Sequence, residues 1–423
     1  MTSAASALIS PPHNAWTASR EEGLRRLAAF LPAAGRRYAE TRNYDLGPGA
    51  RPNVSQLSPW IRHRLVREEE VVAAVLRRHS FLAAEKFIQE VAWRTYWKGW
   101  LELRPMVWHH YREAVCTLMR QIETDAVFCR RWEEAAGGRT GIACFDAWVR
   151  ELVEEGYLHN HARMWFASIW VFTLALPWQL GADLFLRHLK DGDAASNTLS
   201  WRWVAGLQTP GKTYLARPDN IERYTAGRFA KVQGLATVAR PLNEEPIPAL
   251  ATLPRAETGD PYSESVGLLV IEDDCDPLSL DVPWRKVKAV AGVTASARRS
   301  PLPTAEGAAA FSHDAVADAL GRVHRAFGCP ADHFRDDVDV AAIVDWARAS
   351  GLRHLVTAYV PVGPAAEWLA ELRVALAAAG VGLSQRRRAW DEALWPYATR
   401  GFFPFKERLP TALQRLGLTG DEA

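Results

Sequence analysis

Two polar clusters interrupt the apolar, tryptophan-rich stretch that runs from Tyr157 to Trp203. The first is YLHNHARM at residues 157–164, and the second is DGDAASN at residues 191–197, followed by Trp-Arg-Trp at 201–203. Polar groups in such surroundings must find partners, because burying them unpaired is costly. Both clusters are therefore expected to line one site, and their carboxylates, amides and arginine suit a large, polar ligand.

A loop that runs into a helix is predicted at residues 53–62, with the sequence NVSQLSPWIR. Hydroxyl groups and backbone amides at the start of a helix suit a phosphate group. Alone the segment is a weak signal, because serine before proline at a helix start is usually only a cap.

A third cluster holds Glu90, Trp93 and Arg94. Glu90 and Arg94 are four residues apart and so share one face of a helix. In isolation the pair would be read as a surface ion pair.

Composition limits the class of protein. The 423 residues allow two domains or three, and the five cysteines form no Cys-x-x-Cys, so we expect no disulfide scaffold, iron–sulfur cluster or other metal site. A net charge of +2 gives no bulk argument for nucleic acid, so phosphate-tracking cations would have to be local. The candidates are Arg62, Arg64, Arg67, Lys212 and Arg217, each of which is singly more often a solvated surface charge.

Targeting signals are not evident in the sequence. The N-terminus lacks a charged segment followed by an apolar one, and no run of 18 apolar residues occurs. We therefore expect a cytoplasmic protein with no membrane partner.

The hydrophobic pattern divides the chain into four parts. We expect a flexible N-terminus at 1–16, an all-α domain at 17–239, a proline-rich linker at 240–263 and an α/β domain at 264–423. Strands alternate with helices in the last part, which predicts a Rossmann-like fold with a mostly parallel sheet.

Together the polar segments resemble the FAD-binding domain of the photolyase/cryptochrome family, over roughly residues 18–230. The matching motifs are Ser-x-Leu-Ser-Pro, Glu-x-x-Trp-Arg, Asn-x-x-Arg-Met, and Asp-x-Asp-x-x-x-Asn followed by Trp-x-Trp. They begin at Ser55, Glu90, Asn160 and Asp191, in the order that the family has.

The resemblance implies a bent FAD held in a helical pocket. Residues implied to contact its diphosphate are Ser55, Leu57 and Ser58, and either Tyr38 or Tyr44 adds a further contact. Val54 departs from the family's usual threonine, which puts one phosphate contact in doubt.

The residues implied to line the flavin are Phe87, Arg94, Asn160, Arg163, Asp191, Asp193 and Asn197. Arg163 and Asp191 would form an ion pair beside the ring. Asn197 would face flavin N5, where a neutral hydrogen bond favours the fully reduced anion.

The resemblance also implies a substrate pocket for a pyrimidine dimer flipped out of DNA. Glu90 would hydrogen-bond the dimer, Trp93 and Trp203 would form aromatic walls, and Met164 would add a contact.

Electron relay and proton transfer are the remaining implied roles. Trp201 and Trp178 take the family's positions for the proximal and middle relay tryptophans, while the distal member has no match here. His159 and His161 bracket Asn160 and could donate a proton as in (6-4) repair, although histidines there more often complete a hydrogen-bond network.

The α/β part resembles the family's antenna domain, which normally precedes the flavin domain. Residues 266–271 resemble its first strand, and residues 358–383 a later strand–helix–strand unit. We therefore expect an order-swapped architecture, with a generic α/β cap as the alternative. No residues can be assigned to an antenna chromophore.

The leading prediction is light-driven, FAD-dependent repair of cyclobutane pyrimidine dimers, the activity of a deoxyribodipyrimidine photo-lyase, with damaged DNA as partner. The alternatives are a cryptochrome-like blue-light photoreceptor and a non-repair flavoprotein of the same fold. Lesion specificity, oligomeric state and the redox state of the flavin stay open.

Overall fold

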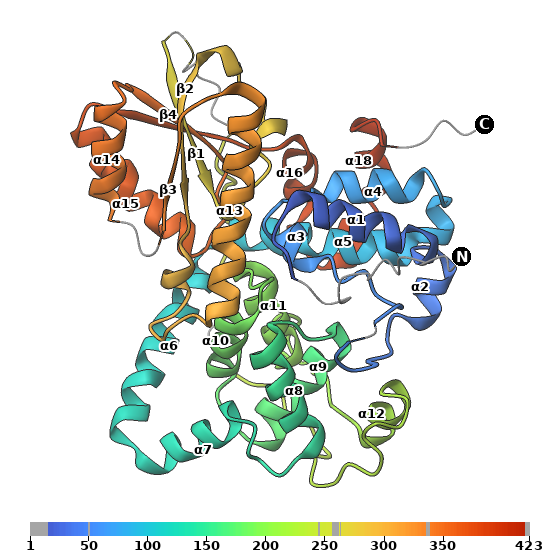
Figure 1. Ribbon diagram of the computed structural model, residues 1–423. Coiled ribbons are helices and arrows are strands. Elements are labelled where there is room, and N and C mark those ends of the chain that lie inside the picture. The colour runs from blue at the N-terminus through green and yellow to red at the C-terminus, as the bar shows by residue number, and fades with distance from the viewer. Residues whose placement is uncertain are drawn as a thin grey trace, which may run out of the picture.

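The computed structural model describes residues 16–49, 51–243, 246–255, 262, 264–335 and 339–418. The predicted flexible N-terminus therefore lies outside the described residues, except for Trp16. Parts of the predicted linker and the last five residues also lie outside them. Figure 1 shows a helical half, blue to green, below and beside a sheet flanked by helices, gold to orange.

The helical half contains no strand among the described residues 16–243. Its helices are α1 (Arg20–Phe30), α2 (Arg36–Thr41), α3 (Ser58–Arg62), α4 (Glu68–Leu76), α5 (Phe81–Glu102), α6 (Met106–Thr124), α7 (Ala126–Ala136), α8 (Ala143–Glu155), α9 (Asn160–Ser168), α10 (Trp178–His188), α11 (Ala194–Val204) and α12 (Pro218–Tyr224). The helical pattern of the sequence is confirmed.

Local signals set several helix boundaries. Ser19 caps α1, its hydroxyl accepting from the Glu22 amide at 3.2 Å, as the Ser-x-x-Glu pattern predicts. Helix α9 does not continue as a regular α-helix, because a π-helical turn follows it at Ile169–Thr173. Pro177 follows that turn and cannot continue a helix.

The second half is built on a parallel sheet of five strands, so the predicted α/β fold class is confirmed. The strands are β1 (Val266–Ile271), β2 (Val287–Val293), β3 (Ala331–Phe334), β4 (His354–Ala358) and β5 (Gly382–Arg386), in the order β3-β2-β1-β4-β5. The sequence pattern did not predict β3, because this short edge strand is half-exposed and carries no apolar run.

Helices cover both faces of the sheet (Figure 1). Helix α13 (Glu306–Phe327) packs on one face, and its apolar residues join the core of the helical half. Helices α14 (Val340–Ala349) and α15 (Pro364–Ala378) close a separate core on the other face. The carboxyl end of β1 meets the helical half, where the Cys275 amide donates to the His63 carbonyl at 2.8 Å.

The last part of the chain returns to the helical half. Helices α16 (Ala389–Leu394) and α17 (Phe402–Lys406) contact α5, and α18 (Leu409–Arg415), red in Figure 1, contacts α16. Trp390 Nε1 donates to Thr95 Oγ1 at 2.8 Å, and Tyr96 Oη donates to the Arg400 carbonyl at 2.6 Å.

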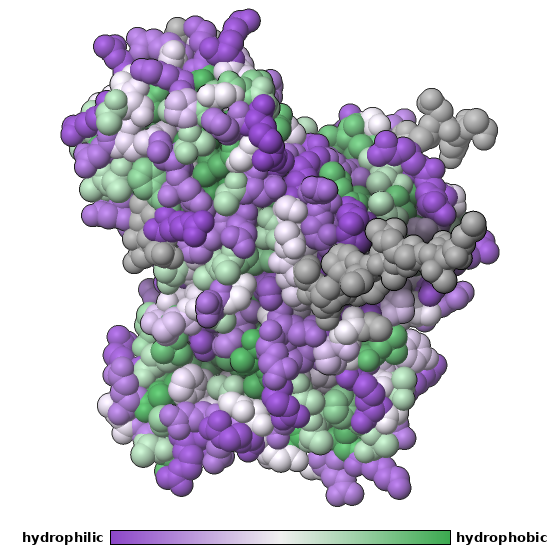
Figure 2. All heavy atoms as spheres, viewed as in Figure 1, coloured by the Kyte–Doolittle hydropathy of each residue, from purple (hydrophilic) through white to green (hydrophobic). Residues whose placement is uncertain are grey.

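The surface is mixed in character. Figure 2 shows hydrophilic and apolar residues interspersed over the visible face of both halves. Large exposed apolar residues such as Leu82 and Val374 lie on different elements, as is normal for a folded surface. None of the helices in the described part of the chain is both long and apolar enough to span a bilayer.

A close approach at Gly99 yields a prediction. A Cβ atom there would lie 2.8 Å from Trp395 Cδ1 and 3.0 Å from Trp395 Cα, so α5 meets the C-terminal segment only without a side chain. Gly99→Ala should lower the free energy of unfolding by about 1–3 kcal/mol, measured by chemical denaturation. Gly401→Ala is the control, because no atom lies within 4 Å of its Cβ position and its φ is −69°. Equal stability of both variants would contradict this packing.

Candidate functional site

A cavity of about 610 Å³ opens between the helices of the helical half. Its size falls within the range of cofactor and ligand pockets. The predicted site residues that line it are Tyr38, Glu90, Trp93, Arg94, Asn160, Arg163, Met164, Asp191, Asp193, Asn197, Trp201 and Trp203. The structure thus brings the separate polar motifs of the sequence to one place.

Asp191 links two of these motifs. Arg163 Nη2 lies 3.0 Å from Asp191 Oδ2, which is the ion pair that the resemblance implied. The Ser58 side chain also hydrogen-bonds Asp191. Burial works to raise the pKa of Asp191, but Arg163, Arg94 and Ser58 outweigh it and hold that pKa below its ordinary value.

Asp193 lies at the start of α11, where it caps the helix and also pairs with two cations. Its Oδ1 accepts from the Ser196 amide at 2.6 Å, which caps the helix. Its Oδ2 lies 3.5 Å from Arg94 Nη1 and 3.9 Å from Lys98 Nζ. Burial opposes ionisation, yet Lys98, Arg94 and Arg62 together hold the pKa of Asp193 far below its ordinary value.

Asn197 lies one turn further along α11. Its Nδ2 donates to the Ala182 carbonyl at 2.7 Å, which fixes the side chain against α10. Asn197 is also among the residues that line the cavity.

Glu90 occupies another wall of the cavity, where it forms an ion pair with Arg42. Burial raises the pKa of Glu90 above its ordinary value, and Arg42 only partly opposes that shift. Sequence reasoning missed Arg42, because this residue lies at the end of α2 with no motif around it.

The aromatic wall near Glu90 has an unpredicted partner. Phe402 stacks on Trp93 with ring centroids 3.6 Å apart and an interplanar angle of 10°, so one face of Trp93 is covered. Phe403, the next residue, lines the cavity and is 72% exposed. No sequence signal linked these C-terminal phenylalanines to the site.

The predicted diphosphate segment lies beside the cavity rather than along its lining. Leu57 is buried and directly precedes α3, and its amide donates to Ser55 Oγ at 3.4 Å. The neighbouring Val54 does line the cavity. Of the two tyrosine candidates, only Tyr38 is among the lining residues. Its ring meets the buried Phe87 edge-on at 5.0 Å.

The two histidines are tied into the helical packing. His159 caps α9, with Nδ1 accepting from the His161 amide at 3.1 Å, and burial lowers the pKa of His159 to about 4. His161 Nδ1 donates to the Asn43 carbonyl at 2.9 Å, and its Nε2 accepts from Tyr214 Oη at 3.1 Å. Burial lowers its pKa also, so both imidazoles are favoured in the neutral form.

The relay candidates are both buried. Trp201 lines the cavity, and its ring lies 6.3 Å from Trp170. Trp178 lies behind the lining and stacks on Tyr111 at 5.7 Å, and Tyr111 in turn lies 5.3 Å from Trp108. The sequence did not indicate this continuation.

The prediction that Arg62 and Arg64 are phosphate-tracking surface cations is wrong. Both side chains are buried and paired with carboxylates from the α/β half, because the carboxyl end of β1 packs onto them. Lys98 was also missed, although it lies four residues after Arg94 on the same helix face.

The cavity fits a large polar cofactor. Among the described residues, neither Arg94 Nη1 nor Ser196 Oγ has a hydrogen-bond partner although both are buried. Such atoms are costly unless a ligand or water pairs with them. The lining combines cationic side chains such as Arg94 and Arg163 with aromatic rings such as Trp201, which suits an anionic group joined to a planar ring system.

Fold and site together define a helical flavoprotein domain joined to a parallel α/β domain. Residues 87–226 match the family model described as the FAD binding domain of DNA photolyase. Residues 87–226 therefore resemble the FAD-binding domain of the photolyase/cryptochrome family.

Individual relatives match only part of the chain. A deoxyribodipyrimidine photo-lyase of Streptomyces griseus is 35% identical over 195 residues, covering 43% of this chain and 41% of that protein. One of Thermus thermophilus is 34% identical over 200 residues, covering 46% and 44%. The chain thus spans less than half the length of these relatives.

Solved structures give similarly partial matches. A bacterial class III photolyase from Agrobacterium tumefaciens matches with a TM-score of 0.40 and 24% identity, covering 49% of this chain and 43% of that one. A Synechocystis cryptochrome matches with a TM-score of 0.41 and 23% identity, over the same shares.

The ion pair at the cavity wall can be tested directly. Arg42→Ala removes the cation that opposes burial, so the pKa of Glu90 should rise further. Infrared difference spectra of the protonated carboxyl band across a pH titration measure this. Lys406→Ala is the control, because Lys406 pairs with Glu85, which lies on the same helix as Glu90. An unchanged titration of Glu90 in the Arg42 variant would refute control by Arg42.

Proposed function

We propose that this protein binds FAD in the cavity and uses it for light-driven repair of cyclobutane pyrimidine dimers in DNA. The observation that carries the proposal is the joint placement of Glu90, Trp93 and Asn197 on the walls of one cavity. In the repair reaction, Asn197 would contact the flavin, and Glu90 and Trp93 would contact the pyrimidine dimer.

The cofactor would be held by charge and shape. Asp191 and Asp193, both kept ionised by nearby cations, give fixed acceptors, and the buried Arg94 Nη1 pairs with Asp193 at 3.5 Å but makes no hydrogen bond within the protein. Asn197 offers a neutral carboxamide oxygen to a ring N–H. Bound and reduced, FAD supplies a photoexcited electron donor, which is chemistry that the protein orients but does not itself perform.

Glu90 would act on the substrate. Burial raises its pKa above the ordinary value, which makes the carboxyl group easier to protonate, and a protonated Glu90 can donate a hydrogen bond to a pyrimidine carbonyl. That bond stabilises the added negative charge on the dimer while the two carbon–carbon bonds between the pyrimidines break. The electron then returns, so the repaired bases carry no net change in oxidation state.

A light-sensing flavoprotein without repair is the second candidate. The covered face of Trp93 and the engagement of Glu90 by Arg42 favour it, because both residues would have to serve the substrate. Flavin binding and photoreduction would be common to both functions, so restoration of thymine separates them.

A repair assay tests the proposal. The reduced protein is illuminated with a dimer-containing oligonucleotide, and thymine restoration is measured. Glu90→Ala should lower the repair yield roughly tenfold, the equivalent of one hydrogen bond to a charged group, with flavin content unchanged. Glu85→Ala, on the same helix but outside the cavity lining, should repair as the wild type does. No restoration by a wild-type protein that binds photoreducible FAD would refute repair and favour light sensing.

The route by which electrons reach the flavin can be proposed as well. Trp201 would begin it, and the stack of Trp178 on Tyr111, with Trp108 beside Tyr111, supports an exit along α10 and α6. Trp108 Nε1 donates to Glu367 Oε1 at 2.6 Å, so an oxidised Trp108 would have a proton acceptor. Tyr111 Oη lacks a partner among the described residues, which disfavours oxidation of Tyr111 itself.

Two matched variants test this route. Trp178→Phe should slow photoreduction of the flavin severalfold, because phenylalanine is hard to oxidise. Trp170→Phe removes a tryptophan that also lies near Trp201 but outside the proposed route, and should leave the rate unchanged. Transient absorption after a blue flash measures both rates. The reverse ranking would place the route through Trp170.

A further inference from the structure

The loop that carries both flavin-site aspartates is held from behind by two buried arginines. Arg62 Nε donates to the Gly192 carbonyl at 2.8 Å, between Asp191 and Asp193. Arg299, from the α/β half, lies with Nη1 3.5 Å from the Leu189 carbonyl. Neither arginine lines the large cavity. They therefore act on the loop from the side away from the ligand.

Both arginines are anchored on the acidic carboxyl end of β1. Arg62 Nη1 lies 3.0 Å from Asp273 Oδ1, and Arg62 Nη2 lies 3.7 Å from Glu272 Oε1. Arg299 Nη2 lies 3.6 Å from the same Glu272 oxygen. All of these groups are buried, so the charges are little screened by solvent. The acidic end of β1 and the flavin loop are thus two ends of one ionic bridge.

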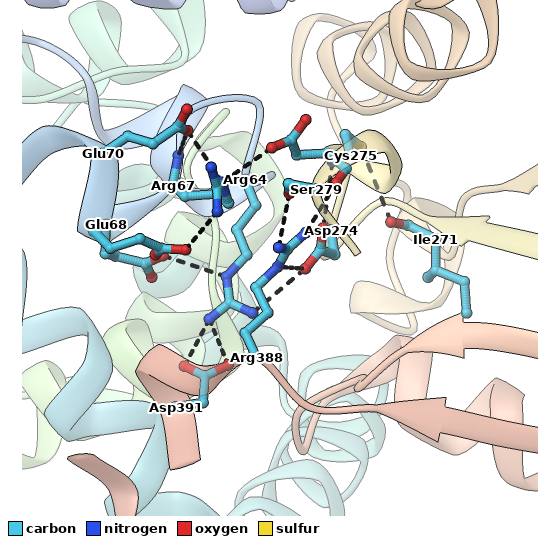
Figure 3. Close-up of polar contacts among 12 residues, drawn as sticks. Arg64, Arg67, Glu68, Glu70, Ile271, Asp274, Cys275, Ser279, Arg388 and Asp391 are labelled. Atoms are coloured by element: carbon cyan, nitrogen blue, oxygen red, sulfur yellow. Dashed lines mark hydrogen bonds and ion pairs between the residues drawn. The ribbon is translucent and has the colours of Figure 1, made fainter. Parts of the chain in front are cut away.

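A second arm runs from the same loop through α5 and α4. Lys98 pairs with Asp193. The charges of Arg64 and Lys98 also hold the pKa of Glu68 below its ordinary value, although burial works to raise it. Arg64 Nε lies 3.3 Å from Glu68 Oε2, and Arg64 Nη2 donates to both Asp391 oxygens at 2.7 Å (Figure 3).

This arm also ends in the α/β half. Arg64 Nη1 lies 3.5 Å from Asp274, which receives two hydrogen bonds of 2.6 Å from Arg388. Figure 3 shows Arg64 and Arg388 pointing toward each other, with Asp274 and Asp391 around them. Residues next to β1 and β5 therefore complete a network that starts at the flavin site.

The network occupies the place where parallel sheets usually bind ligands. The strand order reverses between β1 and β4, and ligands of such folds bind at the carboxyl ends of the strands there. Here a gap of only about 10 Å³ remains among Arg62, Asp193 and Asp273, which is room for about one water. In this chain, side chains of the helical half such as Arg62 occupy the crevice in place of a separate ligand.

We propose that the acidic carboxyl end of β1 is a working part of the flavin site, with Asp273 as a positioning residue that acts through Arg62 on Asp193 and Gly192. The inference rests on the proposed binding of FAD in the large cavity. Without the Asp273 charge, the carboxylates that still attract Arg62 are Glu272 and Asp193. Arg62 then draws Asp193 away from Arg94 and the ligand. The α/β half then sets both the affinity and the reduction potential of the cofactor.

The test uses the full chain with Asp273→Asn. FAD affinity is measured by fluorescence titration of the apoprotein, the flavin midpoint potential by spectroelectrochemistry, and folding by thermal melting of the apoprotein. We expect a dissociation constant roughly tenfold higher and a more positive potential, because a negative charge near the reduced flavin is lost. Asp345→Asn is the control, since it makes the same charge change on the exposed side of α14. It should leave both quantities at the wild-type values.

Wild-type affinity and potential in a folded Asp273→Asn protein would overturn the inference. If that variant does not fold, Arg62→Lys decides, because lysine keeps the charge but cannot bond Gly192 and Asp273 together in the guanidinium geometry. Unchanged FAD affinity of this variant would overturn the inference equally. A wild-type chain that binds no FAD refutes the proposed function and this inference together. One that binds FAD without repairing dimers refutes repair alone.

Discussion

Buried charge that must be paired is the constraint on which this structure depends. Arg64, Glu68 and Asp391 are buried at the junction of the two halves, and removing one partner from such a group typically costs about 3–5 kcal/mol. The helical half alone would leave Arg62 without Glu272 and Asp273. It would leave Arg64 with Glu68 but without Asp274 and Asp391. The α/β half supplies those carboxylates, so its position is fixed by charge as well as by apolar packing.

The same constraint shapes the cavity. Asp191 and Asp193 stay ionised under burial because arginines and a lysine surround them, and that surplus of cations also leaves a donor at Arg94 for an anionic ligand. The pKa of Glu90 is instead raised, because its ion-pair partner Arg42 does not offset the effect of burial. One cavity therefore holds carboxyl groups whose pKa is lowered and one whose pKa is raised, as different roles for acids require.

The order of the two halves along the chain matters less than their contacts. The α/β half follows the helical half in sequence, yet the segment after β5 returns to α5, where Trp390 bonds Thr95 and Phe402 stacks on Trp93. The order of the segments along the chain therefore does not determine which segments form the site. A C-terminal phenylalanine reaches a cavity whose other walls come from residues before 205.

The sequence by itself determined the helical class of the first half, the strand–helix alternation of the second and most of the cavity lining. Helical period, capping and motif spacing are local properties, so the faces carrying Glu90 and Arg94, or Arg163 and Met164, follow from nearest neighbours in the chain. Only the tertiary structure decided that Arg62 is buried, that Arg42 pairs with Glu90 and that Phe402 covers Trp93. Those outcomes depend on which distant charge or ring meets each side chain, and the free energy of such a contact is a property of the packed pair that neither segment encodes alone.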